Sequence, residues 1–144
     1  MGIAITVRNL QRSIKVNVVA LEKFARQALV ECLRIRKKAR TELSRLRAVT
    51  VLLVSDRRMS WLHRRFLGKS GATDVLTFQH GEIVISVETA ARNARRFRTS
   101  LSADLRLYLV HGLLHLQGFD DQTVSQAKKM VSEQNRILAR TGLN

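Results

Sequence analysis

The segment ADLRLYLVHGLLHLQG, residues 103–118, limits the possible folds more than any other part of the chain. On a helix, its apolar side chains would cover nearly the whole circumference, and Ser102 before it is a good N-cap. A helix that is apolar on nearly all sides must be covered by other elements. We therefore expect this helix to lie buried at the centre of the domain.

Hydrophobic periodicity predicts four strands and four further helices around the central one. The predicted strands are residues 3–7, 48–54, 74–78 and 82–87. The predicted helices are residues 18–32, 55–66, 87–97 and 123–140. The last two strands are close enough in sequence to pair at one edge of a sheet. No proline, repeat or low-complexity linker marks a hinge, so residues 1–144 are predicted to form a single α+β domain.

The last predicted helix carries an apolar stripe that we expect to face the core. This stripe consists of Val124, Ala127, Val131 and Leu138. Gly142, which follows the helix, is the predicted C-cap because glycine readily takes the backbone conformation that ends a helix.

The charge of the chain points to a polyanionic partner. There are 26 Lys and Arg residues against 11 Asp and Glu, which leaves a formal net charge of +15. Most of the basic residues are arginine, whose planar guanidinium binds phosphate through two hydrogen bonds. We favour nucleic acid over an acidic membrane surface, since no amphipathic lipid-binding stretch stands out. Ribosomal proteins share this composition.

The sequence predicts a cytoplasmic protein with no membrane partner. No apolar run is long enough to cross a bilayer, and MGIAITVRN lacks the charged and apolar regions of a signal peptide. Cys32 is the single cysteine, which excludes a disulfide framework within the chain and fits a reducing compartment. We interpret Cys32 as a small buried hydrophobe.

Two histidines on the central helix form a candidate metal site. His111 and His115 are four residues apart, so on a helix they project from one face and can share an ion. Gly118 permits the helix to end, and the chain can then bring Asp120 or Asp121 toward the same ion. The alternative is a pair of buried histidines that are each hydrogen-bonded to a backbone carbonyl.

Three protein ligands are typical of catalytic rather than structural zinc, because they leave a position open for water. Such an ion can lower the pKa of that water to about 7, or it can polarise a phosphodiester oxygen. The spacing also resembles metzincin-like proteases, but those enzymes need Glu beside the first histidine, where this chain has Gly112. Peptide hydrolysis is therefore not expected.

Three ordered motifs resemble the YbeY family of bacterial endoribonucleases. His111 to Asp120 match the family signature H-G-x-L-H-L-x-G-[YF]-D-H up to its last residue. ATDVLTF, residues 72–78, is similar to P-T-D-V-L-S-F and is preceded by LHRRFL where the family has L-N-x-x-Y-R. GEIVIS, residues 81–86, is similar to G-D-I-x-I-S.

The resemblance implies a mixed four-stranded sheet packed with about five helices and one zinc ion, or another divalent metal, in a basic cleft. It also implies cleavage of single-stranded RNA in ribosomal RNA maturation and ribosome quality control. The implied partners are ribosomal RNA and the small ribosomal subunit, with no small-molecule cofactor.

The chain departs from the family pattern at two positions. Asp121 replaces the third family histidine; it is our predicted third metal ligand, and Asp120 our predicted cap of the last helix. Leu67 falls where the family has a cleft arginine, and it can neither carry charge nor donate a hydrogen bond. Arg64 or Arg65 can substitute, and we assign Arg65 a catalytic role beside the two histidines. The alternative function is a ribosome-associated RNA-binding protein that cleaves weakly or not at all.

Overall fold

The computed structural model describes residues 2–35, 41–68 and 73–141. Its strands are β1 (Ala4–Asn9), β2 (Ala48–Val54), β3 (Val75–Phe78) and β4 (Glu82–Ser86). Its helices are α1 (Val18–Arg34), α2 (Glu42–Arg45), α3 (Asp56–Leu67), α4 (Val87–Phe97), α5 (Leu101–Leu116) and α6 (Val124–Arg140). The predicted α+β class is confirmed. The short helix α2, which begins with a capping box between Thr41 and Ser44, is additional to the five predicted helices.

The four strands form one mixed sheet in the order β1-β2-β4-β3. Strands β1, β2 and β4 are parallel, whereas β3 runs antiparallel to β4. Val75 pairs with Ile85 and Phe78 with Glu82, so the two strands form the predicted pair at the edge of the sheet. The sheet is mixed, as the resemblance implies, and β3 is left as an edge strand.

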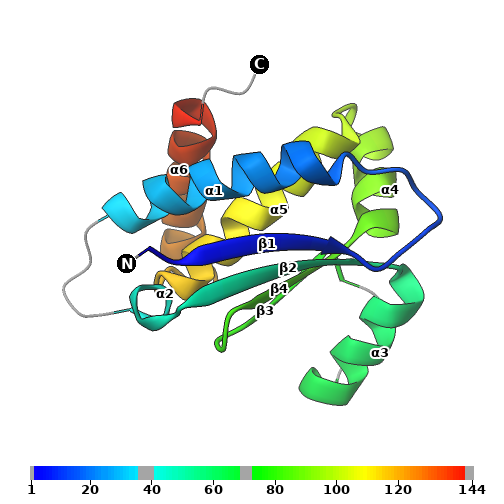
Figure 1. The fold of residues 1–144 in the computed structure, drawn as a ribbon, viewed down its shortest axis with the longest axis horizontal. Coiled ribbons are helices and arrows are strands. Elements are labelled where there is room, and N and C mark those ends of the chain that lie inside the picture. Colours follow the sequence, from blue (N-terminus) through cyan, green and yellow to red (C-terminus); the bar gives the residue numbers. More distant parts are fainter. Residues whose placement is uncertain (1, 36–40, 69–72, 142–144) are drawn as a thin grey trace.

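Helix α5 lies at the centre of the helical layer on one face of the sheet, between α1, α4 and α6 (Figure 1). Its buried side chains include Leu105, Leu109, Val110, Leu113, Leu114 and Leu116. The predicted central helix is therefore confirmed. Its N-cap is Ser100 rather than Ser102, because the Ser100 side chain accepts a hydrogen bond from the Ala103 N–H. Despite its apolar character, neither α5 nor any other helix in the described ranges is long and apolar enough to cross a membrane.

Helix α3 packs on the opposite face of the sheet (Figure 1). Its fully buried residue is Met59, which joins Val54, Leu76 and Val84 in a small second core. The sheet thus separates α3 from α5, and its β3 edge is where elements from the two faces can meet.

Helix α6 presents a different face to the core from the one predicted. Val124 and Val131 are 75% and 50% exposed, whereas Met130, Gln134 and Ile137 are buried. Ala127 is half-buried, and Leu138 packs against the core as expected. Two stripes of side chains run along this helix, and either could face the core. The buried stripe contains the polar Gln134, so apolar periodicity alone favours the other stripe. The predicted C-cap, Gly142, lies outside the described residues.

Cys32 is buried in α1, as predicted. Burial, with a contribution from the negative charge of Glu133, raises the pKa of its thiol to about 12. The thiol therefore stays protonated at neutral pH, and it acts as a packing residue rather than a nucleophile or metal ligand.

Candidate metal centre

The two predicted histidines lie together in the last two turns of α5. Their side chains remain 21% and 28% exposed, for His111 and His115 respectively, so the site is half-buried rather than sealed in the core. The two rings meet edge to face, with centroids 4.6 Å apart. Their Nε2 atoms are 3.0 Å apart. The four-residue spacing on a helix therefore has the consequence expected from the sequence.

Asp121 reaches the same point from the loop after α5. One carboxylate oxygen lies 3.4 Å from Nε2 of His111, and the other lies 3.8 Å from Nε2 of His115. The loop can return because Gly118 has a φ of 100°, in the left-handed region that favours glycine. The Phe119 N–H donates to the Leu114 carbonyl, and the Phe119 side chain is buried in the core.

The structure distinguishes Asp121 from its neighbour Asp120. Asp120 accepts a hydrogen bond from the Asp121 N–H through its side chain, and it is exposed. The prediction that Asp120 caps the last helix is wrong. Helix α6 is capped by Thr123, in a capping box with Gln126, which lies three residues later as that motif requires.

Gln134 holds His111 in position, a contact that sequence reasoning missed. Oε1 of this buried side chain lies 2.6 Å from Nδ1 of His111. Because an amide oxygen only accepts hydrogen bonds, Nδ1 is the donor in this contact, which leaves Nε2 as the ring nitrogen that can bind a metal. Nε2 of His111 thus faces His115 and Asp121. The only signal in the sequence is a glutamine between Met130 and Ile137 on α6.

The environment of His115 keeps its imidazole neutral. Burial lowers the pKa of His115 below its ordinary value, and the nearby His111 ring lowers it further. The carboxylates of Asp121 and Asp120, with a hydrogen bond to the Phe119 backbone, only partly oppose these effects. A neutral imidazole is the form that ligates a metal.

The donor set fits a divalent ion such as zinc. Zinc bonds of about 2.0–2.2 Å in tetrahedral geometry place two donor atoms roughly 3.3–3.6 Å apart. The three separations here are 3.0, 3.4 and 3.8 Å, and all candidate ligand atoms lie within 4.8 Å of one another. Within the described ranges, this is the group of histidine and carboxylate side chains that could hold an ion. Two imidazoles and one carboxylate also leave a position open.

Two hollows adjoin this group. The larger, of about 530 Å³, lies past the β3 edge of the sheet and is lined by both histidines, Asp120 and Leu67 among others. The smaller, of about 310 Å³, is lined by His111, Asp121 and Gln134 among others. Leu67, which stands where the family has an arginine, therefore faces the candidate metal centre.

Arg65 lines neither of these two hollows. Arg64 and Arg65 are both exposed on α3, and Leu67 is the residue of that helix that lines the larger hollow. The catalytic role assigned to Arg65 stays a prediction. Asp74 lines the smaller hollow, and its carboxylate accepts a hydrogen bond from the Val75 N–H at the start of β3.

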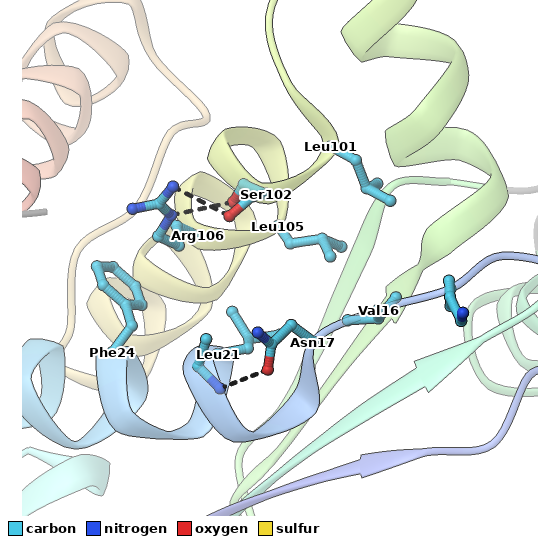
Figure 2. A pocket seen from close by; sticks show the side chains of 10 residues that line it. Val16, Asn17, Leu21, Phe24, Leu101, Ser102, Leu105 and Arg106 are labelled. Carbon is cyan, nitrogen blue, oxygen red and sulfur yellow. Dashed lines mark hydrogen bonds between the residues drawn. The ribbon is translucent and has the colours of Figure 1, made fainter. Parts of the chain in front are cut away.

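A separate hollow of about 480 Å³ lies between the N-terminal halves of α1 and α5 (Figure 2). Its walls include Leu21, Phe24 and Leu105, and the Arg106 guanidinium hydrogen-bonds to the carbonyl and hydroxyl of Ser102. Neither histidine and neither loop aspartate lines it. The candidate metal centre therefore opens onto the two hollows at the β3 edge and not onto this one.

Gln134 offers a direct test of how the site is assembled. We expect Gln134→Leu to weaken metal affinity roughly 10–100-fold, because His111 would lose the partner that sets its proton and ring orientation. Competition with a chromogenic chelator measures this affinity. Asn135→Leu is the matched control, since it makes a similar change at an exposed position of the same helix. Equal affinities of the two variants would contradict an orienting role for Gln134.

The fold and the site define a class of protein: a small α+β domain in which a buried helix and the loop after it bring together three candidate metal donors at the edge of a mixed sheet. The model of the family described as Endoribonuclease YbeY matches residues 6–142. The chain belongs to the YbeY endoribonuclease family.

Individual relatives agree with this assignment. Endoribonuclease YbeY of Anaeromyxobacter sp. (strain Fw109-5) is 40% identical over 124 residues, which cover 76% of this chain and 65% of that protein. The chain thus spans just under two thirds of this relative's length. Endoribonuclease YbeY of Gluconobacter oxydans (strain 621H) is 34% identical over 134 residues, which cover 89% and 78% of the two chains.

A solved structure has the same fold. The solution structure of TM1509 from Thermotoga maritima superposes with a TM-score of 0.66 and 25% sequence identity. The match covers 95% of this chain and 88% of that one. The mixed sheet and its helical layer are therefore found in an experimentally determined relative.

Proposed function

We propose that this protein is a metal-dependent endoribonuclease that cleaves single-stranded RNA during ribosomal RNA maturation and ribosome quality control. The observation that carries the proposal is the convergence of His111, His115 and Asp121 on one point, in a chain of the YbeY endoribonuclease family. We further propose that it acts in the cytoplasm on ribosomal RNA of the small subunit. The net charge of +15 supports a polyanionic substrate.

The proposed mechanism uses the three donors and exposed arginines outside the two hollows. A bound zinc or other divalent ion would supply Lewis acidity toward a phosphodiester oxygen and acidity to water. The two imidazoles would bind through Nε2, with His111 oriented by Gln134. Asp121 would add an anionic oxygen from the loop after α5, while arginines such as Arg65 would hold the RNA backbone.

Metal removal tests the proposal directly. We expect a chelator to abolish cleavage of single-stranded ribosomal RNA fragments by the purified wild-type protein, and stoichiometric zinc or another divalent ion to restore it. Gel analysis of a labelled RNA measures cleavage, and the same RNA in duplex form is the control for strand specificity. Undiminished cleavage by protein shown to be free of metal would refute the metal-dependent mechanism.

A second candidate function is RNA binding with weak cleavage. The observation that favours it is Leu67, which is 53% exposed and lines the larger hollow where the resemblance implies an arginine. An apolar side chain there cannot neutralise the charge that builds up on a phosphate. Both functions predict binding that weakens as salt rises, so cleavage rather than affinity distinguishes them.

Placing an arginine at position 67 distinguishes the two candidate functions. We expect Leu67→Arg to raise the rate of cleavage about tenfold or more, because one well-placed charged donor is worth a few kcal/mol in a transition state. Single-turnover kinetics measure the effect. Val19→Arg adds the same charge at a residue of α1 that is 80% exposed. A similar gain in both variants would show that general electrostatics, rather than the site, explains the change.

A further inference from the structure

The outer face of α3 carries four arginines around one tryptophan. At 100° per residue, Arg57, Arg58, Trp61, Arg64 and Arg65 fall within an arc of about 120°, with Trp61 near its centre. We call these five residues the α3 arginine face. All five are exposed, and Met59 points the other way into the second core. The face is therefore directed to solvent.

The arginines of this face have no acidic partner among the residues that the structure describes. No ion pair within residues 2–35, 41–68 and 73–141 involves any of the four. Some arginines elsewhere in the described ranges do form ion pairs, as in the contact of 2.6 Å between Arg92 and Asp56. Four unpaired guanidiniums on two to three turns of helix form a local concentration of positive charge that favours an anionic ligand.

Trp61 adds a flat apolar surface to this charge. Its side chain is 47% exposed, and the Arg58 guanidinium lies 5.8 Å from the centre of its ring. Both residues line a shallow hollow of about 640 Å³, together with Arg57, Ser55 and Leu10, which is 50% exposed. Aromatic rings flanked by cations are the surfaces on which unpaired bases stack while their phosphates are neutralised.

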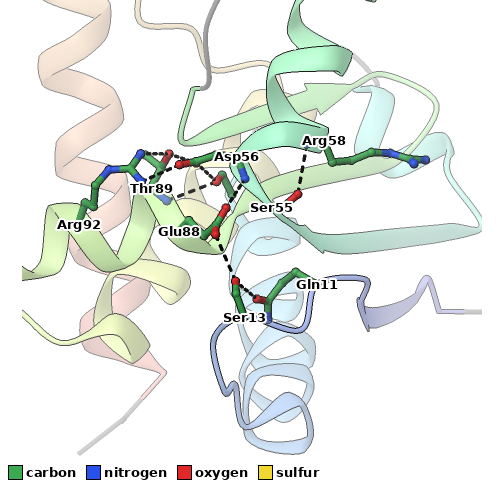
Figure 3. A network of polar contacts seen from close by, with 9 residues as sticks. Gln11, Ser13, Ser55, Asp56, Arg58, Glu88, Thr89 and Arg92 are labelled. Atoms are coloured by element: carbon green, nitrogen blue, oxygen red, sulfur yellow. Dashed lines mark hydrogen bonds and ion pairs between the residues drawn. The ribbon is translucent and has the colours of Figure 1, made fainter.

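Helix α3 is held firmly at its first turn. The Asp56 carboxylate accepts hydrogen bonds from the hydroxyls of Ser86 and Thr89, both at 2.6 Å, and from Arg92 (Figure 3). The Asp56 N–H donates to Glu88. These contacts fix the start of α3 to α4, so the orientation of the α3 arginine face is set by the fold.

The other end of α3 leads to the metal centre. Leu67, its last residue, lines the larger hollow with His111 and His115. Leu67 lies ten positions after Arg57, which is a rise of about 15 Å along the helix. On the helical wheel, Leu67 lies about 60° from Arg64, so the face and the hollow adjoin at this end of the helix.

We propose that the α3 arginine face is a binding surface for single-stranded RNA, on which an unpaired base stacks against Trp61 and the arginines bind the flanking phosphates. This surface would lead the strand along α3 toward the metal centre. The inference rests on the proposed function and adds to it a contact outside the hollows that adjoin the metal centre. Duplex RNA fits poorly because its bases are already stacked on each other.

Trp61 is the only tryptophan of the chain, so its fluorescence reports on this surface alone. The probe is a single-stranded 12-nucleotide RNA of mixed sequence, titrated into the wild-type protein with cleavage followed in the same samples. We expect saturable quenching of the Trp61 emission by the single strand. We expect much weaker quenching by a duplex of the same length or by an abasic strand.

Substitutions then test the energetics. Trp61→Ala is expected to weaken binding of the 12-nucleotide RNA about tenfold, and Trp61→Phe to recover part of the loss. Arg57→Ala/Arg58→Ala should lower the slope of log affinity against log salt by about 1.4, since each phosphate contact contributes about 0.7 on single strands. Arg95→Ala/Arg96→Ala is the matched control, because it removes two exposed arginines beside an exposed aromatic residue, Phe97, on α4.

The outcomes separate this inference from the proposed function. Unquenched Trp61 at saturating RNA, or equal losses in the α3 and α4 variants, would overturn the α3 surface even if cleavage persists. Quenching by an acidic protein but not by RNA would also overturn it. Selective loss of binding in the α3 variants would support the surface, whether or not the protein cleaves.

Discussion

Replacing His111 with alanine is expected to leave the purified protein without stoichiometric metal and to lower its rate of RNA cleavage about a thousandfold. His111 faces both other donors, with Nε2 at 3.0 Å from His115 and 3.4 Å from Asp121. Without it, two donors remain, which is too few for a stable zinc site. Lewis-acid stabilisation worth several kcal/mol would be lost, and each 1.36 kcal/mol is about a tenfold change in rate. Elemental analysis and single-turnover cleavage measure the two effects.

Two further variants make this experiment specific. His80→Ala removes a histidine that pairs with Glu82 at 2.9 Å on the surface, and it should keep full metal content and activity. Asp121→Ala changes a side chain that is 41% exposed, so it should fold normally yet bind metal weakly. Wild-type cleavage by the His111 variant would remove the metal from the mechanism. Loss of metal in Asp120→Ala but not in Asp121→Ala would make Asp120 the third ligand.

Replacing Gly112 with glutamate would complete the protease-type pattern, but we expect this change to prevent folding rather than to create a peptidase. A Cβ atom at position 112 would lie 2.7 Å from Cγ2 and 2.9 Å from Cδ1 of Ile83. Ile83 is fully buried on β4, so α5 would have to move away from the sheet. Overpacking costs about 1–3 kcal/mol, and an unpaired buried carboxylate adds several more. Since typical domains are stable by about 5–15 kcal/mol, circular dichroism should show a largely unfolded chain.

Milder substitutions identify the cause of this loss. We expect Gly112→Ala to lower the free energy of unfolding by about 1–2 kcal/mol, because steric overlap outweighs the better helix propensity of alanine. In an Ile83→Ala background the same change should be neutral or stabilising, since the side chain it meets has been removed. Denaturant unfolding of the wild type, the two single variants and the double variant gives the coupling free energy between positions 112 and 83. An equal penalty in both backgrounds would contradict the contact between α5 and β4.

Much of the fold followed from local patterns. The apolar circumference of residues 103–118 predicted the buried central helix, and alternation and turn residues predicted the β3–β4 pair at the sheet edge. The two histidines of the candidate site were equally predictable, because a spacing of four residues on a helix places side chains together whatever surrounds them. Gly118 was a correct sign that the chain turns back after α5.

Contacts between distant segments were not predictable in this way. Val124 and Val131 were expected in the core, yet α6 buries Met130, Gln134 and Ile137. Both stripes are compatible with a helix, and only packing against α5 selects one of them. That selection places Gln134 beside His111, 23 residues earlier in the chain.

The sequence by itself therefore determined the central helix and the histidine pair, and its charge predicts a polyanionic partner. Only the tertiary structure decided that Asp121 lies beside the two histidines, that Gln134 contacts His111, and that Leu67 rather than Arg65 lines the hollow. The physical reason is range: helix and strand periodicity relate residues a few positions apart. The approach of a loop, a second helix and a sheet edge to one point depends on how the whole core packs.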